Sequence, residues 1–528
     1  MSPRSITPNK ASLWSRLPVE LRDMVFGHLL TPRRSLYATY ARVNKEWNAY
    51  WEPKLFRKLV LTPDDLEYLS EVFGGDNTRR LRYLHRLDFD IILEKYDCDL
   101  CDKAEDEGTA LRNDYTMTMC LLRLLMSLHP LEPATKPSGE QHRVTLTITC
   151  FSRSDTKHHY KPLAMRLNSL TDEFEEIEEP ESGRSNGHGP LPVDKHYECA
   201  TRLFGSRRLQ WCFGDGHQVL EPPQKLPEAR IITDLSLDLA SYRTLGRNVV
   251  WRLVQEGFPS LVALNHEQWL RLKPPEQLRP DENFVEMIGT QWPNTFPRRI
   301  QRLSLFSDAD PRLHQGGPRP ATHHEAGRSL ALASQYLSVL TCGFAADAAG
   351  FLDDFFEDRC PEVMMRWEHL TKLCLTAACF ESDTGDEISS LLSAAARAAR
   401  RMPQLLVFEM WNCGNGQAAR FCYETRQRTR EGNYYPASIV WACTWSPACI
   451  DQSDPAIGEW RRLARDRSGG LEAGVRFSKI EMKPIELRTH LAMIPHLRLS
   501  TDMLCSTTHG RIKYKTRMRR DGKHDSLV

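Results

Sequence analysis

Cysteine and histidine side chains are the residues of this sequence that could hold a metal ion. Cys98 and Cys101 form its one Cys-x-x-Cys pair, and two thiolates at that spacing supply half of a tetrahedral zinc site. No second pair follows at zinc-ribbon spacing. Nothing in the pattern orders the other available ligands, which are Cys120 and the pairs His158-His159 and His323-His324. We therefore expect loop thiols here, with no metal and no cofactor.

Adjacent carboxylates could perform general acid and base chemistry, as at Asp353-Asp354 and Glu357-Asp358 in an expected helix. With 69 acidic residues in the chain, such adjacency arises by chance. The sequence lacks a Walker phosphate loop, a GxSxG elbow, an HExxH helix and a GxGxxG turn. We predict no catalytic residue and no enzymatic activity. A deep pocket lined by convergent polar side chains would instead indicate an enzyme.

The composition is typical of a globular protein of two to four domains, at 528 residues and 41% apolar residues. The net charge of +1 gives no argument for a nucleic acid or membrane partner, and no apolar run is long enough to span a bilayer. Residues 1–12 are expected to be a flexible leader, not a secretory signal. Fifteen cysteines without such a signal indicate a reducing compartment, so we expect a cytoplasmic and/or nuclear protein.

The segment from Leu17 to Leu30 has the pattern of a short amphipathic helix, with Pro18 in its first turn, where a missing amide costs nothing. A second helix is predicted from Ser35 to Trp51. The apolar residues at helical spacing are Leu21, Met24, Val25 and Leu29 in the first segment and Leu36, Tyr40, Val43 and Trp47 in the second. So few residues bury too little surface for an independent core. This unit should lean on something else.

This N-terminal pattern resembles the F-box. That family opens with Leu-Pro-x-Glu-Leu, continues as an apolar helix ending in Leu, and closes near Val-x-x-x-Trp. The matching residues are Leu17, Pro18, Glu20, Leu21, Val25, Leu29, Val43 and Trp47. The resemblance implies a substrate-receptor subunit of an SCF-type cullin–RING ubiquitin ligase, which binds a small adaptor subunit of the cullin complex and an unknown target protein. The adaptor-binding residues it implies are Leu17, Pro18, Leu21, Val25, Leu29, Val43 and Trp47.

A different interpretation of the same helices stays open. An ordinary helical hairpin could pack on the body of the protein and cap its core, as the ends of repeat proteins require. The chain would then be a structural protein-interaction scaffold outside a ubiquitin ligase. In that case, deletion of residues 1–61 should expose apolar surface and cause aggregation.

The first part of the body is predicted to contain a βαβ unit. A helix is expected to start at Pro63, and strands are expected over Leu84–Ile91 and Val144–Thr149, where apolar and polar residues alternate. A helix between the strands is predicted from Asp114 to Leu128, with Asp114 as its N-cap. Residues 171–228 are acidic and then rich in Pro and Gly, which favours a solvated insertion.

Short strands of the form L-x-x-L-x-L recur after this insertion, with centres roughly 28 to 41 positions apart. They are expected at Ile232–Leu237, Leu261–Leu264, Ile300–Leu305, Leu337–Leu340, Leu370–Leu375, Leu405–Trp411 and Ser438–Trp441. Helices are expected between several of them, most clearly over Tyr242–Glu256 and Ile388–Met402. The fold class is therefore α/β: a short all-α N-terminal unit followed by an irregular, leucine-rich-repeat-like strand–helix solenoid.

Residues 300 to 490 also resemble an uncharacterised C-terminal domain of filamentous-fungal F-box proteins, through Trp367–Leu375, Met402–Leu405 and Phe408–Asn412. The last residues, 508–528, are basic and poor in apolar side chains, so we expect a disordered tail or a fraying edge strand. The predicted division is thus a leader (1–12), the F-box-like unit (13–61), linker and first α/β units (62–170), the insertion (171–228), a substrate-binding domain (229–507) and a basic tail (508–528).

Overall fold

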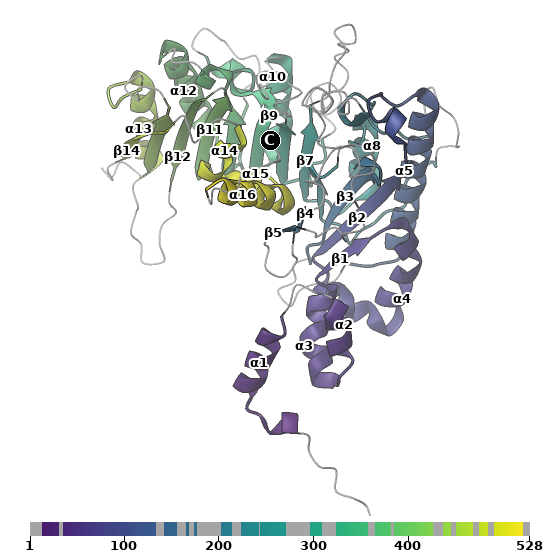
Figure 1. Ribbon diagram of the computed structural model, residues 1–528. Helices are drawn as coiled ribbons and strands as arrows, with labels where there is room; N and C mark the ends of the chain where they lie inside the picture. Colours follow the sequence, from purple (N-terminus) through teal and green to yellow (C-terminus); the bar gives the residue numbers. More distant parts are fainter. Residues whose placement is uncertain are drawn as a thin grey trace, which may run out of the picture.

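A twelve-stranded sheet runs through the body of the molecule, and the N-terminal helices lie below it in Figure 1. The structure is a computed structural model. It describes residues 13–30, 35–133, 142–155, 165–167, 174–176, 202–213, 223–241, 243–270, 296–308, 324–356, 365–381, 385–414, 416–425, 437–444, 450–467, 475–483 and 490–520. The strands of the sheet, in spatial order, are β1 (Lys58–Leu61), β2 (Arg86–Leu93), β3 (Thr145–Ser152), β6 (Asp234–Leu237), β7 (Ala263–Trp269), β8 (Arg302–Asp308), β9 (Val339–Asp347), β10 (Lys372–Thr376), β11 (Val407–Gly414), β12 (Gln417–Glu424), β13 (Ser438–Cys443) and β14 (Arg476–Glu481).

The strands follow one another in chain order, and all neighbours are parallel except β12, which is antiparallel to both β11 and β13. This regular advance is consistent with a leucine-rich-repeat-like solenoid, so the predicted α/β class is confirmed, as are the seven strands expected after residue 229. Strands β1, β12 and β14 were not predicted from the sequence. A signal for β12 was present, because Asn415-Gly416 is a hairpin sequence and Gly416 has a φ of +79°.

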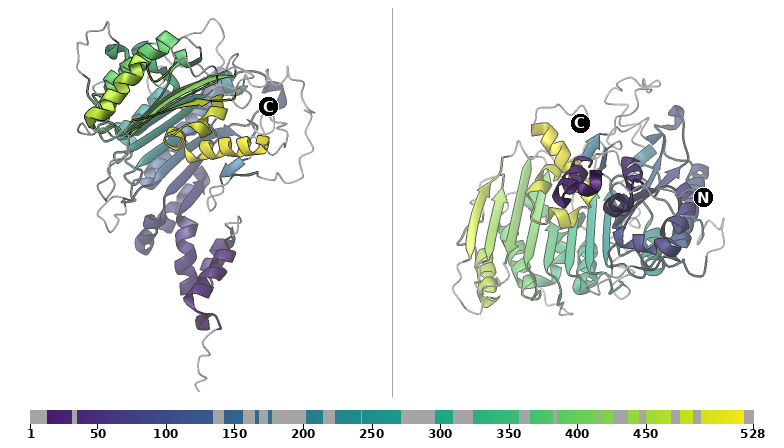
Figure 2. Two further views of the ribbon diagram at one scale, coloured as in Figure 1. Left: turned by 90° about the vertical axis from the view of Figure 1, so that its left-hand side faces the viewer. Right: turned by 90° about the horizontal axis from the view of Figure 1, so that it is seen from below.

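Helices cover one face of the sheet (Figure 2). They are α4 (Leu69–Phe73), α5 (Glu107–Leu128), α8 (Arg247–Arg252) with a π-helical turn over Leu253–Gly257, α10 (His324–Ala333), α11 (Ala348–Phe351), α12 (Gly385–Ala399) and α13 (Pro455–Arg467). Short 3-10 turns join them at Pro63–Tyr68, Gly75–Tyr83, Cys98–Leu100, Ser334–Tyr336, Asp353–Phe355 and Ala378–Glu381. The main core lies between this layer and the sheet, because alternate strand residues such as Leu87, Phe89 and Ile91 point toward the helices.

The predicted βαβ unit is present, since β2 and β3 are parallel and α5 connects them. Asp114, however, is not the N-cap of that helix. Asp106 caps it, accepting the main-chain N–H of Thr109 at 2.8 Å, and the helix begins two turns earlier than predicted. The buried Asp114 carboxylate instead accepts the main-chain N–H of Gln210 at 2.8 Å and pairs with Arg207. Asp114 is therefore a partner of Arg207, which lies 93 positions away in the sequence, and not a helix cap.

The N-terminal helices are α1 (Val19–His28), α2 (Ser35–Ala41) and α3 (Lys45–Phe56), after a 3-10 turn over Leu13–Arg16. The single helix predicted from Ser35 to Trp51 is therefore wrong. Asn44 starts a new helix in the middle of that range, because its side chain accepts the main-chain N–H of Trp47 at 3.0 Å. The second helix then continues through Pro53 to Phe56.

Residues 490–513, here called the C-terminal strap, cover the other face of the sheet (Figure 2). The strap comprises α14 (His490–Met493), a 3-10 turn (Ile494–His496), α15 (Ser500–Met503) and the first half of α16 (Ser506–Arg520). Its buried apolar residues form a second core against β8 to β12, and they are Met493, Ile494, Leu497, Leu499, Met503, Leu504 and Ile512. The prediction of a disordered tail or edge strand from residue 508 is therefore wrong as far as Arg520, and residues 521–528 lie outside the described residues.

Two fully buried carboxylates of the sheet hold the strap. Glu409 of β11 accepts the main-chain N–H groups of Arg498 and Leu499, both at 2.9 Å, and pairs with Arg420 at 2.6 Å. Glu267 of β7 accepts the main-chain N–H of Cys505 at 2.6 Å and also the Thr508 hydroxyl. Hydrogen bonds to charged acceptors are the stronger kind. This face of the sheet, over β7 to β12, is therefore filled by the chain itself.

The predicted insertion, 171–228, is described only at residues 174–176, 202–213 and 223–228. Within it, Phe174–Glu176 is a strand, β5, which pairs antiparallel with β4 (Met165–Leu167). Residues 202–213 are not a solvated loop, since Leu203, Phe204, Leu209 and Cys212 are buried. No helix in the described part of the chain is long and apolar enough to cross a membrane.

Candidate protein interaction site

A small aromatic core holds the N-terminal helices together. Phe26, Tyr37 and Trp51 are fully buried in it. The ring of Phe26 stacks on Tyr50 with centroids 4.1 Å apart and meets the edge of Trp47 at 5.1 Å. This core is separate from the main core of the sheet. Phe26 is the one buried residue of α1, and Arg22 of the same helix pairs with Glu46 of α3.

Polar contacts tie α3 to the body while leaving α1 free of the sheet. The buried Glu52 carboxylate of α3 pairs with Arg80 at 2.9 Å and with Arg79 at 3.2 Å, and the Arg80 guanidinium lies over the ring of Phe56. Within the unit, Trp14 Nε1 donates to Glu46 at 2.8 Å. In Figure 1, α1 lies beside α3, below the sheet.

Exposed apolar side chains are concentrated in this N-terminal unit. Fourteen large apolar side chains are exposed among the described residues, and seven of them lie between residues 19 and 43. They are Val19 (58%), Leu21 (45%), Met24 (59%), Val25 (37%), Leu30 (42%), Leu36 (37%) and Val43 (56%). Monomeric proteins rarely expose apolar groups in such concentration, and a concentrated patch marks an interaction surface. We call these seven residues the N-terminal apolar face.

The residues predicted to bind a partner divide into two groups. Leu21, Val25 and Val43 belong to the N-terminal apolar face, and the exposed Pro18 stands immediately before α1, not within it. Leu17 is half-buried at the preceding turn, and the half-buried Leu29 packs on the aromatic core. The ring of Trp47 contacts Trp14, Phe26 and Tyr40. Trp47 is therefore half-buried and packs against the aromatic core.

Sequence reasoning missed Val19, Leu30 and the anchor Phe26. The helical stripe through Leu21, Val25 and Leu29 was visible, but Phe26 lies off that stripe and nevertheless takes the inner position. A helix with apolar residues on all sides must bury more than one of them. The surplus of apolar residues in this helix was the sequence signal for a surface that binds a partner.

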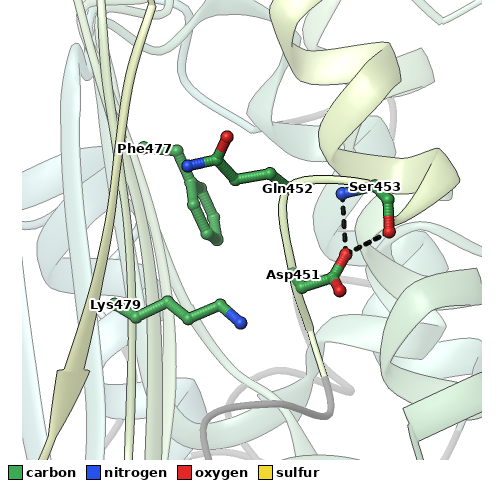
Figure 3. A pocket seen from close by; sticks show the side chains of 5 residues that line it. All are labelled: Asp451, Gln452, Ser453, Phe477 and Lys479. Carbon is green, nitrogen blue, oxygen red and sulfur yellow. Dashed lines mark hydrogen bonds between the residues drawn. The ribbon is translucent and has the colours of Figure 1, made fainter.

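A hollow of about 490 Å³ lies beside β14 and is lined by Asp451, Gln452, Ser453, Phe477 and Lys479 (Figure 3). The Asp451 carboxylate accepts the main-chain N–H of Ser453 at 2.6 Å, and the hydrogen bonds from Ser453 lower its pKa. This carboxylate stays charged near neutral pH and is held by its own turn. It therefore lacks the raised pKa that a general acid needs.

The cysteines and the adjacent carboxylates named in the sequence analysis do not form a reactive site in the described part of the chain. The side chain of Cys98 lies outside the described residues, and Cys101 is buried. Burial raises the pKa of the thiols of Cys120 and Cys342, to about 11 and about 12, which makes them poor nucleophiles. Asp354 pairs with Arg328 at 3.4 Å, and Glu357 and Asp358 lie outside the described residues. No group of three or more His, Cys, Asp or Glu in the described ranges could hold a metal ion.

Comparison with known proteins finds a match in the second half of the chain. No curated protein matches this protein. The comparisons add nothing on residues 13–61. Residues 295–505, from just before β8 to the strap, match a protein family described as a family of unknown function, DUF6546.

Proposed function

We propose that this protein is a non-catalytic substrate-recognition subunit of an SCF-type cullin–RING ubiquitin ligase. The observation that carries the proposal is the N-terminal apolar face, which stands on its own aromatic core. The adaptor subunit of the ligase would cover this face. The body would bind a target protein and hold it near the ubiquitin-loaded conjugating enzyme.

The proposed role requires no chemistry by this chain. Tethering makes the encounter between target and conjugating enzyme intramolecular, at an effective concentration of roughly millimolar. Burial of apolar surface would drive the adaptor contact at about 25 cal/mol per Å². A few central side chains usually dominate such an interface, and truncation of one costs about 2 kcal/mol or more. Leu21 and Val25, at the centre of α1, are the candidates.

The arrangement of the cores supports this proposal over a scaffold in which the helices cap the sheet. A cap would share its apolar core with the sheet, whereas Phe26, Tyr37 and Trp51 form a separate cluster, and Phe56 at the end of α3 packs against the main core. In the body, the strap already covers the sheet over β7 to β12. We therefore place the target on a different surface, and its identity is open.

The test is co-purification of the tagged full-length chain from a eukaryotic cell, followed by mass spectrometry for adaptor and cullin peptides. The variant Leu21→Asp with Val25→Asp should abolish recovery of both partners, because it places two charges in the buried interface. Leu17→Ala with Pro18→Ala should act in the same direction. Both variants should keep the wild-type melting temperature, since none of these four residues is buried.

A matched control is Ile480→Asp, which changes an equally exposed apolar side chain (47%) at the far end of the sheet. It should leave adaptor recovery unchanged. Undiminished adaptor binding by the α1 variants would refute the proposal. Aggregation on deletion of residues 1–61, with no adaptor recovered from wild type, would favour the capped scaffold instead.

A further inference from the structure

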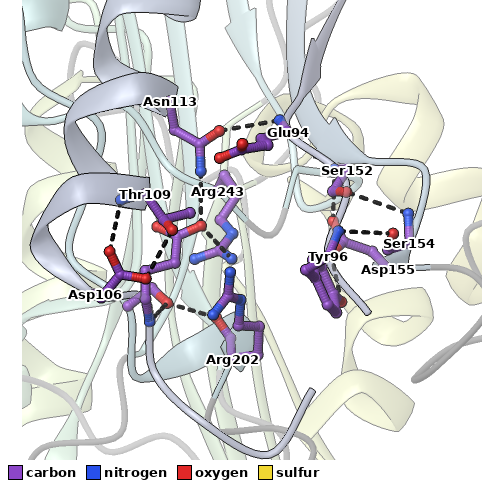
Figure 4. Close-up of polar contacts among 12 residues, drawn as sticks. Glu94, Tyr96, Asp106, Thr109, Asn113, Ser152, Ser154, Asp155, Arg202 and Arg243 are labelled. Carbon is purple, nitrogen blue, oxygen red and sulfur yellow. Dashed lines mark hydrogen bonds and ion pairs between the residues drawn. The ribbon is translucent and has the colours of Figure 1, made fainter. Parts of the chain in front are cut away.

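A buried cluster of charged side chains lies at the carboxyl ends of β2 and β3 (Figure 4). Arg243 and Glu105 form an ion pair of 2.8 Å in which both side chains are at least 96% buried. The Arg202 guanidinium, also buried, lies 4.8 Å from the centre of the Tyr96 ring, and the Tyr96 hydroxyl donates to Asp155 at 2.8 Å. The carboxyl edge of parallel strands is where open α/β sheets bind ligands.

The acceptors of this cluster are well used. Glu105 also accepts from Asn113 Nδ2 at 2.7 Å, and Asp155 accepts the main-chain N–H of Ser152 at 2.8 Å. Burial raises the pKa of both carboxyl groups, although the two arginines oppose the rise. The negative charge available to Arg202 and Arg243 is therefore less than the count of carboxylates suggests.

Several N–H donors of the two arginines, by contrast, lack a hydrogen-bond acceptor. Arg243 Nε and Nη1 and Arg202 Nε are buried and have no hydrogen-bond partner among the described residues. A buried, unsatisfied donor destabilises the folded state, and it does so more strongly when it is charged. Such groups in a native structure call for an occupant, either water or an ion. The side chain of Arg243 is 97% buried, so bulk solvent does not serve it.

A small cavity stands beside Arg243. Ser206, Arg207, Arg243 and Thr244 form its polar wall, and Phe204 and Trp269 belong to its apolar wall. Its volume of about 10 Å³ is that of one water-sized occupant. Two guanidinium groups on the wall exclude a cation, and the volume excludes phosphate or a nucleotide. The Arg207 charge is already paired with Asp114, so Arg243 supplies the free donors.

We propose that this cavity binds a single monovalent anion of the size of chloride or of one carboxylate oxygen, with Arg243 as its principal ligand and Arg202 as a second source of positive charge. The anion satisfies donors that the fold leaves unpaired and thereby fixes the segment 202–213 against α5. The proposal does not depend on a role in ubiquitin transfer.

The first test uses crystals of the full-length chain grown with bromide. An anomalous peak within hydrogen-bond distance of Arg243 is expected, and its absence at this cavity would overturn the proposal in favour of a water molecule. The second test is thermal denaturation at constant ionic strength, with chloride replacing a bulky sulfonate. The melting temperature should rise by about 2 °C or more and saturate, whereas no dependence on the anion would also overturn the proposal.

Variants separate this site from general salt effects. Arg243→Gln should lose the chloride dependence, and Arg230→Gln, which removes a 57%-exposed arginine paired with Glu228, should keep it. If Arg243→Gln does not fold, the bromide peak in wild-type crystals still decides the question. Acetate in place of chloride distinguishes the source. Equal stabilisation by acetate indicates a site that also accepts a protein carboxylate, and stabilisation by halide alone indicates an inorganic ion.

Discussion

The substitution Glu409→Gln should release the C-terminal strap from the sheet. Glu409 is fully buried and its carboxylate is shared by two main-chain N–H groups of the strap and by Arg420, which is itself 15% exposed. Removing one member of a buried ion pair costs about 3–5 kcal/mol. Glutamine keeps one acceptor oxygen, so we expect about 3 kcal/mol, the lower end of that range.

Hydrogen exchange measured by mass spectrometry checks this expectation, because exchange reports local opening in units of free energy. A loss of about 3 kcal/mol should speed exchange of peptides from residues 490–513 by roughly a hundredfold. Peptides from α12, on the opposite face of the sheet, provide the internal reference and should change much less.

Glu424→Gln is the matched control. Its carboxylate bonds the side chain of the same Arg498 at 3.2 Å, but that arginine is 58% exposed. A surface pair of this kind contributes about 0.2–1 kcal/mol, so exchange in the strap should rise by less than about fivefold. Equal protection of the strap in wild type and Glu409→Gln would refute the idea that this carboxylate holds it. A uniform rise that includes α12 would refute local release.

Four further predictions concern stability. Burial and the nearby Glu267 raise the pKa of Asp238 to about 7, so the stability that its protonated form provides is lost as the pH rises through 7. Asp238→Asn should therefore stabilise the protein at pH 8 by at most about 4 kcal/mol and leave its stability unchanged near pH 4. Urea unfolding at the two pH values checks this expectation. Phe26→Ala should cost about 3–5 kcal/mol of the stability of the N-terminal helices, visible as faster hydrogen exchange in α1 while the sheet keeps its protection. Gly458→Ala in α13 should raise the melting temperature, since its Cβ meets nothing within 4 Å and alanine favours a helix by about 0.5–1 kcal/mol. Gly327→Ala should lower it, because its Cβ would lie 2.5 Å from the backbone of Gly350 and Phe351.

Much of the sheet could be predicted because its signal is local. In strand β8, Leu303 and Leu305 belong to the core on the helix side, and residues two apart in a strand share one face of the sheet. The helix over Gly385–Ala399 is equally local, since its run of alanines favours helix without help from other segments. Edge strand β14 was not predicted because it lacks this local signal: its residues are mostly exposed and show little apolar alternation.

The candidate site was predictable only in part. The stripe through Leu21 and Val25 indicated an apolar face, and the sequence alone established that the N-terminal unit is too small to bury all its apolar residues. The sequence could not say which side of α1 faces inward. That depends on Phe26 meeting Tyr50 and Trp47, which belong to a different helix.

The sequence by itself thus determined the α/β class, the advance of strand and helix along the chain, and the surplus of apolar residues at the N-terminus. Only the tertiary structure decided what the basic C-terminal segment does. Its composition is that of a solvated tail, yet Cys505 donates to Glu267 across 238 positions of sequence. A carboxylate buried on a strand must find donors wherever the fold brings them, and no local pattern in either segment records that pairing.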